Sequence, residues 1–135
     1  MKSNRYENGL KKYLAFDRKK GKKMLEYLKS VSPDLEKYVI EFMFGDILSR
    51  PVLDIKPRLL IAIGLLAQQN ATAQLKGHVY AALKLGCTQQ EIREVVIQTL
   101  IYAGFPTAIN AMKVVNEAFN KVKEQKKVKD YSSKQ

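Results

Sequence analysis

The sequence predicts an all-α fold, and three observations lead to that prediction. Apolar residues recur every three or four positions over most of the chain, residues that cap helices precede these runs, and Gly or Pro follows them. Pairs of alternating apolar segments joined by tight turns are absent, as are internal repeats. The 135 residues include 46% hydrophobic side chains, which is enough for one domain with its own core.

The first part of the chain predicts three amphipathic helices. Residues 5–16 and 19–29 combine narrow apolar stripes with many lysines, as in short helices that lie against a larger body. Ser32 then precedes Pro33, an arrangement in which the serine caps a helix and the proline takes its first position. We expect this third helix to end near Leu48.

The middle of the chain predicts the core. Residues 57–68 are apolar almost all round, which indicates a fully buried helix rather than a surface helix. Asn70 is expected to cap a helix over residues 71–85, and Gly86 is expected to end it in the left-handed conformation.

The last part of the chain predicts two further helices. Thr88 and Glu91 have the spacing of a capping box, so residues 89–103 are expected to be helical despite several β-branched side chains. A Gly-Phe-Pro break at 104–106 precedes a helix over about 107–124. We therefore expect one helical domain over residues 1–124, followed by a Lys-rich, frayed tail over 125–135.

The net charge of +11 comes from the two ends of the chain. Residues 1–29 hold ten basic and three acidic residues, residues 121–135 hold six and two, and residues 30–120 hold eight of each. A nucleic-acid-binding domain usually concentrates charge on one face, together with side chains that read bases. We therefore interpret the lysines as solvated helix faces that attract small anions, and nucleic acid is not a favoured partner.

Composition also excludes several classes of protein. The longest apolar run, residues 59–67, is about half of the roughly 18 residues that a membrane span needs, and residues 1–12 lack the apolar segment of a signal peptide. A cytoplasmic protein without membrane contact is expected. Cys87 is the only cysteine, so neither an internal disulfide nor a dithiol site is available, and we interpret it as a semi-buried structural residue.

His78 is the residue that stands out as a site candidate. It is the only histidine, which argues against a metal site, and it lies mid-helix beside the apolar positions Leu75 and Ala82. A lone histidine in such a place is more often a hydrogen-bonded structural residue than a catalyst, and both interpretations stay open. Histidine is also the side chain best suited to proton transfer at neutral pH.

Two segments resemble the carboxymuconolactone decarboxylase family. Residues 78–111, HVYAALKLGCTQQEIREVVIQTLIYAGFPTAINA, are similar to the family pattern of His, Gly, Thr-x-x-Glu-Ile-x-Glu, Gln and Tyr-x-Gly-x-Pro. Residues 42–58, FMFGDILSRPVLDIKPR, are similar to its Phe-x-x-Gly element, followed by Arg-Pro-x-Leu-Asp and a further Arg. The spacing agrees in both segments, and the resemblance covers about residues 35–120.

The resemblance implies both a fold and a reaction. The fold is a compact multi-helix domain of the alkylhydroperoxidase D-like type, assembled as a trimer or hexamer. The reaction is decarboxylation of a small carboxylated lactone such as 4-carboxymuconolactone, without a metal or an organic cofactor. In this interpretation His78 is the catalytic proton carrier, Arg50 and Arg58 hold the anionic substrate, and Gln98 and Tyr102 donate hydrogen bonds to the developing oxyanion.

Two other functions stay open at this point. Peroxidase-like members of the superfamily use a CxxC pair and a Glu, and this chain has Ala71 and Gln74 at the cysteine positions and Leu59 near the Glu position. Thiols would have to come from elsewhere. The second alternative is a non-enzymatic oligomeric scaffold that uses its basic ends on an anionic partner.

The predicted binding residues also have structural interpretations. Arg50 and Arg58 could form salt bridges with Asp46, Asp54 or Glu41 instead of binding a substrate. Likewise, Gln98 could serve only to orient neighbouring helices, and Tyr102 could belong to a tight corner between two helices.

Overall fold

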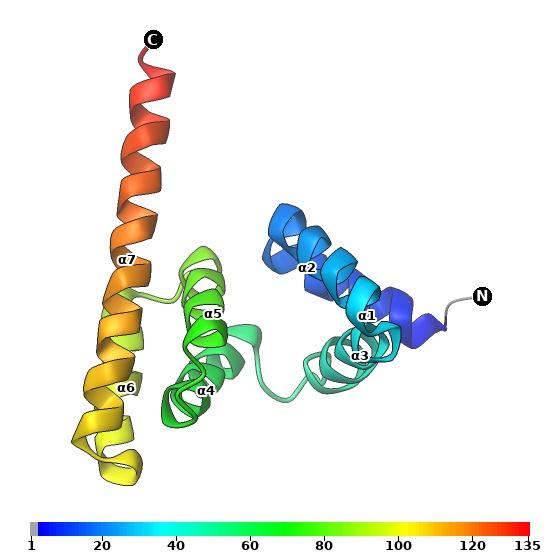
Figure 1. Cartoon of the computed structure of the whole chain (residues 1–135), viewed down its shortest axis with the longest axis horizontal. Helices are drawn as coiled ribbons and strands as arrows, with labels where there is room; N and C mark the ends of the chain where they lie inside the picture. The colour runs from blue at the N-terminus through cyan, green and yellow to red at the C-terminus, as the bar shows by residue number, and fades with distance from the viewer. Residues whose placement is uncertain (1–2) are drawn as a thin grey trace. The chain divides into compact units, whose positions relative to one another are not determined.

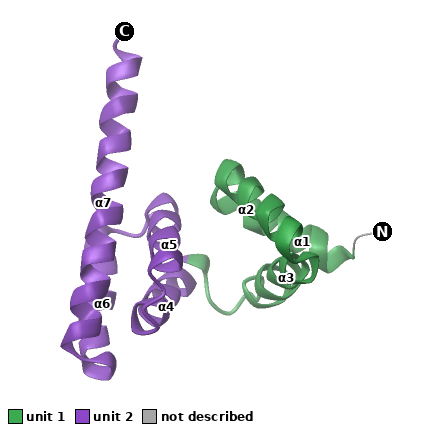
Figure 2. Cartoon of the chain, viewed as in Figure 1, with its two compact units in different colours: residues 1–55 green, residues 56–135 purple. Residues whose placement is uncertain are grey.

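The structure is a computed structural model that describes residues 3–135. Every regular element in this part of the chain is a helix, so the all-α prediction is confirmed (Figure 1). The chain divides into two compact units, one up to Ile55 and one from Lys56 onward (Figure 2). The single domain expected over residues 1–124 stays a prediction, and each unit is described by itself.

Unit 1 contains four helical segments whose starts follow the sequence. They are α1 (Asn4–Phe16), α2 (Arg18–Val31), α3 (Pro33–Tyr38) and η1 (Val39–Ile47). The side chains of Ser3, Asp17 and Ser32 each accept a hydrogen bond from a backbone N–H three residues further on. Each cap satisfies an amide that has no partner inside its helix, and the predicted cap at Ser32 is confirmed.

The third predicted helix changes its winding part-way. After Tyr38 the backbone continues as a π-helix through Ile47, and the Leu48 N–H donates to the Met43 carbonyl oxygen, 2.9 Å away and five residues back. The periodicity of the sequence gave no indication of this wider helix. The segment does end where it was predicted to end.

The backbones of α1 and η1 touch where they cross. A Cβ atom added at Gly9 would overlap the Ile40 carbonyl oxygen, and one at Gly45 would lie 2.8 Å from the Arg5 carbonyl oxygen. Glycine is therefore required at both positions for so close an approach. The apolar core beside the crossing consists of Tyr6, Leu25 and Ile40 with Leu10, Tyr13 and Leu14 packed against it.

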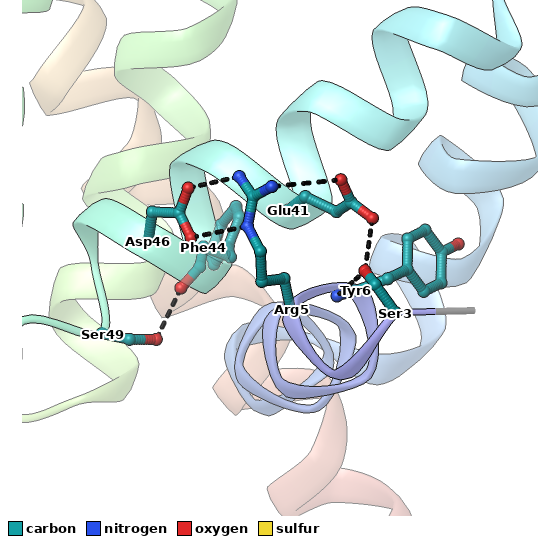
Figure 3. A network of polar contacts seen from close by, with 7 residues as sticks. All are labelled: Ser3, Arg5, Tyr6, Glu41, Phe44, Asp46 and Ser49. Atoms are coloured by element: carbon teal, nitrogen blue, oxygen red, sulfur yellow. Dashed lines mark hydrogen bonds and ion pairs between the residues drawn. The ribbon is translucent and has the colours of Figure 1, made fainter.

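A polar network joins the same two helices (Figure 3). Arg5 donates to Asp46 through Nε, at 3.0 Å, and Nη2, at 2.5 Å, and its Nη1 lies 3.9 Å from a Glu41 oxygen. The Ser3 hydroxyl donates to Glu41 at 2.6 Å. The Arg5 guanidinium lowers the pKa of the Asp46 carboxyl through a hydrogen bond and its positive charge.

Unit 2 contains four helices packed around a second core. They are α4 (Ile55–Gln68), α5 (Thr72–Lys84), α6 (Gln89–Ala103) and α7 (Phe105–Ser133), and both α5 and α6 pack against α7. A 3.0 Å ion pair between Lys76 and Glu117 ties α5 to α7, and the Arg93 guanidinium lies over the Phe119 ring of α7, 4.9 Å from its centroid. The largest fully buried side chains of this core are Ile63, Leu75, Val79, Ile92, Val96 and Val115.

The ends of α6 follow the sequence prediction. Glu91 N–H donates to the Thr88 hydroxyl at 3.0 Å and Thr88 N–H donates to the Glu91 carboxylate at 3.1 Å, so the capping box is confirmed. Gly86, with φ of 96°, follows the last turn of α5, and Gly104, with φ of 83°, separates α6 from α7. Both positions need the conformational freedom of glycine.

Asn70 was predicted wrongly as the cap of α5. It has a positive φ of 56°, and its N–H donates to the Ala67 carbonyl oxygen, so it terminates α4 instead. Asparagine is one of the few residues other than glycine that tolerates this conformation. The helix that follows begins at Thr72, without a side-chain cap.

Two further helices differ from the prediction. The helix expected to be fully buried, α4, buries one face through Leu59, Ile63 and Ala67, whereas Ile61 and Leu65 are 52% and 57% exposed. Helix α7 runs to Ser133 rather than ending near residue 124. Its last turns contain neither glycine nor proline and are rich in good helix formers, which explains why the helix continues.

Candidate active site

His78 lies in the middle of α5 with its imidazole partly exposed. Its neighbour Val79 is fully buried, so His78 is at the edge of the core rather than inside it. The imidazole Nδ1 lies 2.8 Å from the Gln74 carbonyl oxygen, one turn earlier. A carbonyl oxygen only accepts hydrogen bonds, so Nδ1 donates, and the neutral ring then has its lone pair at Nε2.

This bond gives the ring a fixed orientation and tautomer. A histidine held through Nδ1 by a backbone carbonyl presents Nε2 as the nitrogen that takes up or delivers a proton. The same bond also satisfies the imidazole structurally, as the structural interpretation of His78 requires. The geometry is therefore compatible with proton transfer, and His78 as a catalyst stays a prediction.

Three of the four predicted binding residues lie in the same unit as His78. Arg58 is in the first turn of α4, and Gln98 and Tyr102 are four residues apart on α6, so their side chains share one face of that helix. Tyr102 is 81% exposed, and Gln98 is exposed as well. Arg50 belongs to unit 1, where it lies exposed after η1.

Two of the carboxylates considered as partners of Arg50 and Arg58 form ion pairs with a different arginine. Both Asp46 and Glu41 interact with Arg5 on α1, as Figure 3 shows. Sequence reasoning missed this partner because Arg5 is 41 residues from Asp46, and no periodic signal joins two helices that far apart.

Cys87 is buried just before α6 and has the character of a structural thiol. It is 4% exposed, and burial, together with the Glu91 carboxylate, raises the pKa of its thiol. A raised pKa lowers the fraction of the nucleophilic thiolate at neutral pH. This agrees with the interpretation of Cys87 as a structural residue.

Two open depressions lie on unit 1. One, of about 460 Å³, is lined by Arg5, Lys37, Tyr38, Glu41 and Phe42. The other, of about 250 Å³, is lined by Lys20, Lys23, Met24 and Tyr27. None of the five predicted site residues lines either depression, and both depressions contain basic side chains.

Within residues 3–135, no helix is both long and apolar enough to span a membrane. The same part of the chain contains no grouping of three or more His, Cys, Asp or Glu side chains placed to hold a metal ion.

The comparisons with known proteins identify the family. Residues 33–117 match the carboxymuconolactone decarboxylase family, which is more than half of the chain. The chain belongs to this family. The match begins at the first residue of α3, ends within α7, and contains all five predicted site residues.

Individual relatives agree with this membership. A 4-carboxymuconolactone decarboxylase from Acinetobacter baylyi is 29% identical over 116 residues, covering 85% of this chain and 87% of the relative. A nitrosuccinic acid decarboxylase from Metarhizium robertsii is 36% identical over 85 residues, which are 63% of this chain but only 59% of that protein. An uncharacterized 15.0 kDa protein from Paracoccus denitrificans is 32% identical over 94 residues, 68% of this chain and 70% of the relative.

Proposed function

We propose that this protein is a carboxy-lyase that removes carbon dioxide from a small carboxylated lactone resembling 4-carboxymuconolactone. The observation that carries the proposal is the family match over residues 33–117, which contains His78 and all four binding candidates. The similarity to a 4-carboxymuconolactone decarboxylase over most of both chains supports the lactone as substrate.

The reaction makes three demands on the protein. Cleavage of the bond to the carboxylate releases carbon dioxide and leaves an electron pair, which moves through the conjugated system onto the lactone oxygen. A proton must then be delivered to carbon to give the neutral lactone product. The site must hold an anion, stabilise an oxyanion and carry one proton.

His78 suits the proton step because of its bond to Gln74. With Nδ1 held by the carbonyl oxygen, a protonated ring delivers the proton at Nε2 to the substrate carbon and becomes neutral, and water restores the proton. Such a positioned acid typically contributes about 10²–10⁴ in rate.

The other candidate residues bind the anionic substrate or stabilise the oxyanion that forms from it. In this proposal a guanidinium group holds the anionic substrate, with Arg58 of unit 2 and Arg50 of unit 1 as the candidates, since a guanidinium fits a carboxylate with two parallel hydrogen bonds. The phenol of Tyr102 and the amide of Gln98 donate to the oxyanion. One preorganised donor of this kind is worth roughly 3 kcal/mol in the transition state.

The two named relatives act on acids that share one chemical feature, which supports a proposal for the substrate class. Lactone carbonyl and nitro groups both take up the electron pair that decarboxylation leaves behind. We therefore propose that the substrate class is a small carboxylic acid with such an electron-accepting group, and that the carboxylated lactone is its preferred member.

The experiment compares the wild-type chain with His78→Gln on 4-carboxymuconolactone and on nitrosuccinic acid, with carbon dioxide release as the readout. Gln fits the helix and keeps a hydrogen-bonding group, so the melting temperature should stay within a few degrees while turnover falls about 10²-fold or more. Lys84→Gln is the matched control, because it removes a basic side chain from an exposed position of the same helix.

A structural histidine predicts the reverse pattern. Loss of a satisfied imidazole would lower the stability by roughly 1–3 kcal/mol, and turnover per folded chain would survive. That result would refute the assignment of His78. Wild-type protein without turnover on either acid would refute the proposed reaction.

A further inference from the structure

The larger depression on unit 1 has the dimensions of a small-molecule site. Its volume of about 460 Å³ lies within the range of roughly 300–1,000 Å³ that ligand pockets occupy. Three helical segments supply its lining, with Arg5 from α1, Lys37 and Tyr38 from α3, and Glu41 and Phe42 from η1. We call it the η1 depression, and none of the residues assigned to the decarboxylation lines it.

Two aromatic side chains of the η1 depression are open to solvent. Tyr38 is 62% exposed and Phe42 is 59% exposed. They lie four residues apart on adjoining helical segments, and both line the same depression. Aromatic rings stack on flat, conjugated molecules, and a ligand that covers them also removes apolar surface from water. The η1 depression therefore favours a ligand with a planar apolar body.

Lys37 supplies a positive charge for such a ligand. Its ammonium group makes no ion pair within residues 3–135, whereas the charge of Arg5 is shared by Asp46 and Glu41 (Figure 3). Residues 1–55 contain twelve basic and eight acidic residues, so the surroundings of the depression also attract anions. The ligand that fits both the rings and the charge is a planar organic anion.

The polar wall of the η1 depression is fixed by contacts within unit 1. Arg5 donates to Asp46 through Nε and Nη2, and the Ser3 hydroxyl donates to Glu41 at 2.6 Å. Within residues 3–135 the remaining terminal nitrogen, Nη1, makes no hydrogen bond, and its distance to Glu41 is 3.9 Å. Nη1 is therefore a donor with a fixed position, and a fixed donor loses little conformational entropy when it binds an acceptor.

The winding of η1 is a second indication that this region has a function. Residues Val39–Ile47 form a π-helix, a rare conformation that is frequently found at functional sites. Glu41 and Phe42 both belong to it and both line the depression. The proposed decarboxylation does not account for this winding, because none of its five residues lies in η1.

We propose that the η1 depression binds a small planar organic anion. The apolar body of the ligand lies against Tyr38 and Phe42, and its acidic group contacts the Lys37 ammonium and Arg5 Nη1. Aromatic carboxylates and aromatic sulfonates both have this chemistry. The proposal does not rest on the proposed function, since it uses none of the same residues.

Titration of the full chain with anilinonaphthalene sulfonate at low salt tests the site. This dye is an aromatic anion that fluoresces strongly only when it is shielded from water, and the chain contains no tryptophan that would excite it. We expect saturable binding to the wild type. Phe42→Ala should weaken the affinity for the dye about tenfold, because one ring is lost. Lys37→Gln should weaken it about two- to fivefold, because an exposed charge is lost.

Two matched controls remove the same kinds of side chain elsewhere. Lys29→Gln removes another exposed lysine of unit 1, and Tyr131→Ala removes an exposed aromatic ring of α7. Neither residue lines the depression, so both variants should bind the dye as the wild type does. Equal losses in the control and test variants would show attachment to basic and apolar surface in general, which would overturn the proposal.

Two further variants detect dye that is bound at another place. Lys23→Gln changes the smaller depression of unit 1, and His78→Gln changes the site of the proposed function. We expect neither to alter the affinity. A loss in either variant, together with unchanged binding in Phe42→Ala and Lys37→Gln, would place the dye outside the η1 depression and overturn the proposal.

Displacement of the dye tests the need for an acidic group. Benzoate and benzyl alcohol have the same ring, but only benzoate has a negative charge. Benzoate should displace the dye from the wild type at a concentration about two- to fivefold lower than benzyl alcohol, and this difference should disappear in Lys37→Gln. Equal displacement from the wild type would overturn the role of Lys37, and a wild-type chain that does not bind the dye would overturn the site itself.

Discussion

Burial sets the reactivity of Cys87. The thiol is 4% exposed, and burial raises its pKa. We expect iodoacetamide to modify Cys87 at pH 8 more slowly in the folded chain than in the same chain unfolded in urea, because folding lowers both access and the thiolate fraction.

Thiol reductant and hydroperoxide together should give no turnover that depends on Cys87. Robust peroxide turnover that disappears in Cys87→Ser would contradict this expectation and revive the peroxidase-like alternative.

Tyr6 links the stability of unit 1 to high pH. Its hydroxyl donates to the Glu36 carboxylate, and burial, followed by this hydrogen bond, raises the pKa of Tyr6 to about 12. An unfolded tyrosine has a pKa of about 10. The folded pKa is the higher one, so the stabilisation is fully present below pH 10 and is lost as the pH rises towards 12.

Thermal melts at pH 8 to 12 measure this effect. Tyr6→Phe should be less stable than the wild type at pH 8, by roughly 1–3 kcal/mol, because Glu36 loses its buried donor. It should also lose less stability between pH 10 and 12. Tyr131→Phe, at an exposed tyrosine, is the control and should follow the wild type. An equally steep loss in Tyr6→Phe would show that another group controls the transition.

At the residue scale, the sequence singled out His78 because it is the only histidine and lies inside a family-like motif. It did not reveal the Gln74 carbonyl as partner of the imidazole, although a spacing of four residues on a helix makes that contact available. The partners of Arg5 and Tyr6 are beyond sequence reasoning, since they lie 30 or more residues away on other helices. Contacts between residues one helical turn apart can be predicted from their spacing, whereas these long-range pairs depend on how the helices pack together.

The crossing of α1 with η1 makes unit 1 sensitive to one methyl group. Gly9→Ala should destabilise the protein by about 1–3 kcal/mol or more, because the new Cβ would overlap the Ile40 carbonyl oxygen and the helices would have to move apart. Gly77→Ala is the matched control on α5, where no atom lies within 4 Å of the new Cβ. It should stabilise by roughly 0.5–1 kcal/mol. Urea denaturation of the two variants with similar midpoints would argue against a close crossing.

Helix ends were predictable wherever a side chain or a glycine makes them. Ser32, Thr88 with Glu91, Gly86 and Gly104 act through contacts or backbone conformations within three residues, and each is where the sequence placed it. Asn70 has two possible roles, as a cap or as a left-handed stop, and the sequence does not distinguish them. The segment η1 is a π-helix that packs against α1, and the sequence contains no periodic signal for this winding.

At the scale of the whole molecule, the sequence pattern did not show which surface of α4 is buried. The helix over residues 57–68 was expected to be buried because it is apolar on all sides, yet within unit 2 its residues Ile61 and Leu65 are exposed. The periodicity of apolar residues predicts which faces of a helix favour burial, but it does not predict which part of the structure packs against each face. The difference between the apolar surface of α4 and its burial therefore concerns contacts outside unit 2.

Two separate apolar surfaces predict an assembly larger than a dimer. Residues 59–75 and residues 95–112 both contain no charged residue. The first stretch exposes Ile61 and Leu65 one turn apart on α4, and the second exposes Ile101 and Phe105 at the junction of α6 and α7. A single self-complementary surface produces a closed dimer, whereas two different surfaces allow further copies to join and close a ring or a higher symmetric assembly.

Light scattering of the 15.4 kDa chain at micromolar concentration measures this directly. The wild type should have more than twice the mass of one chain, as a trimer or hexamer would. Leu65→Lys alone and Ile101→Lys alone should each lower the mass, and the double variant should be monomeric, because both uncharged surfaces then carry a lysine that repels the other basic chains. A wild-type monomer, or a double variant that keeps its mass, would exclude assembly through these two surfaces.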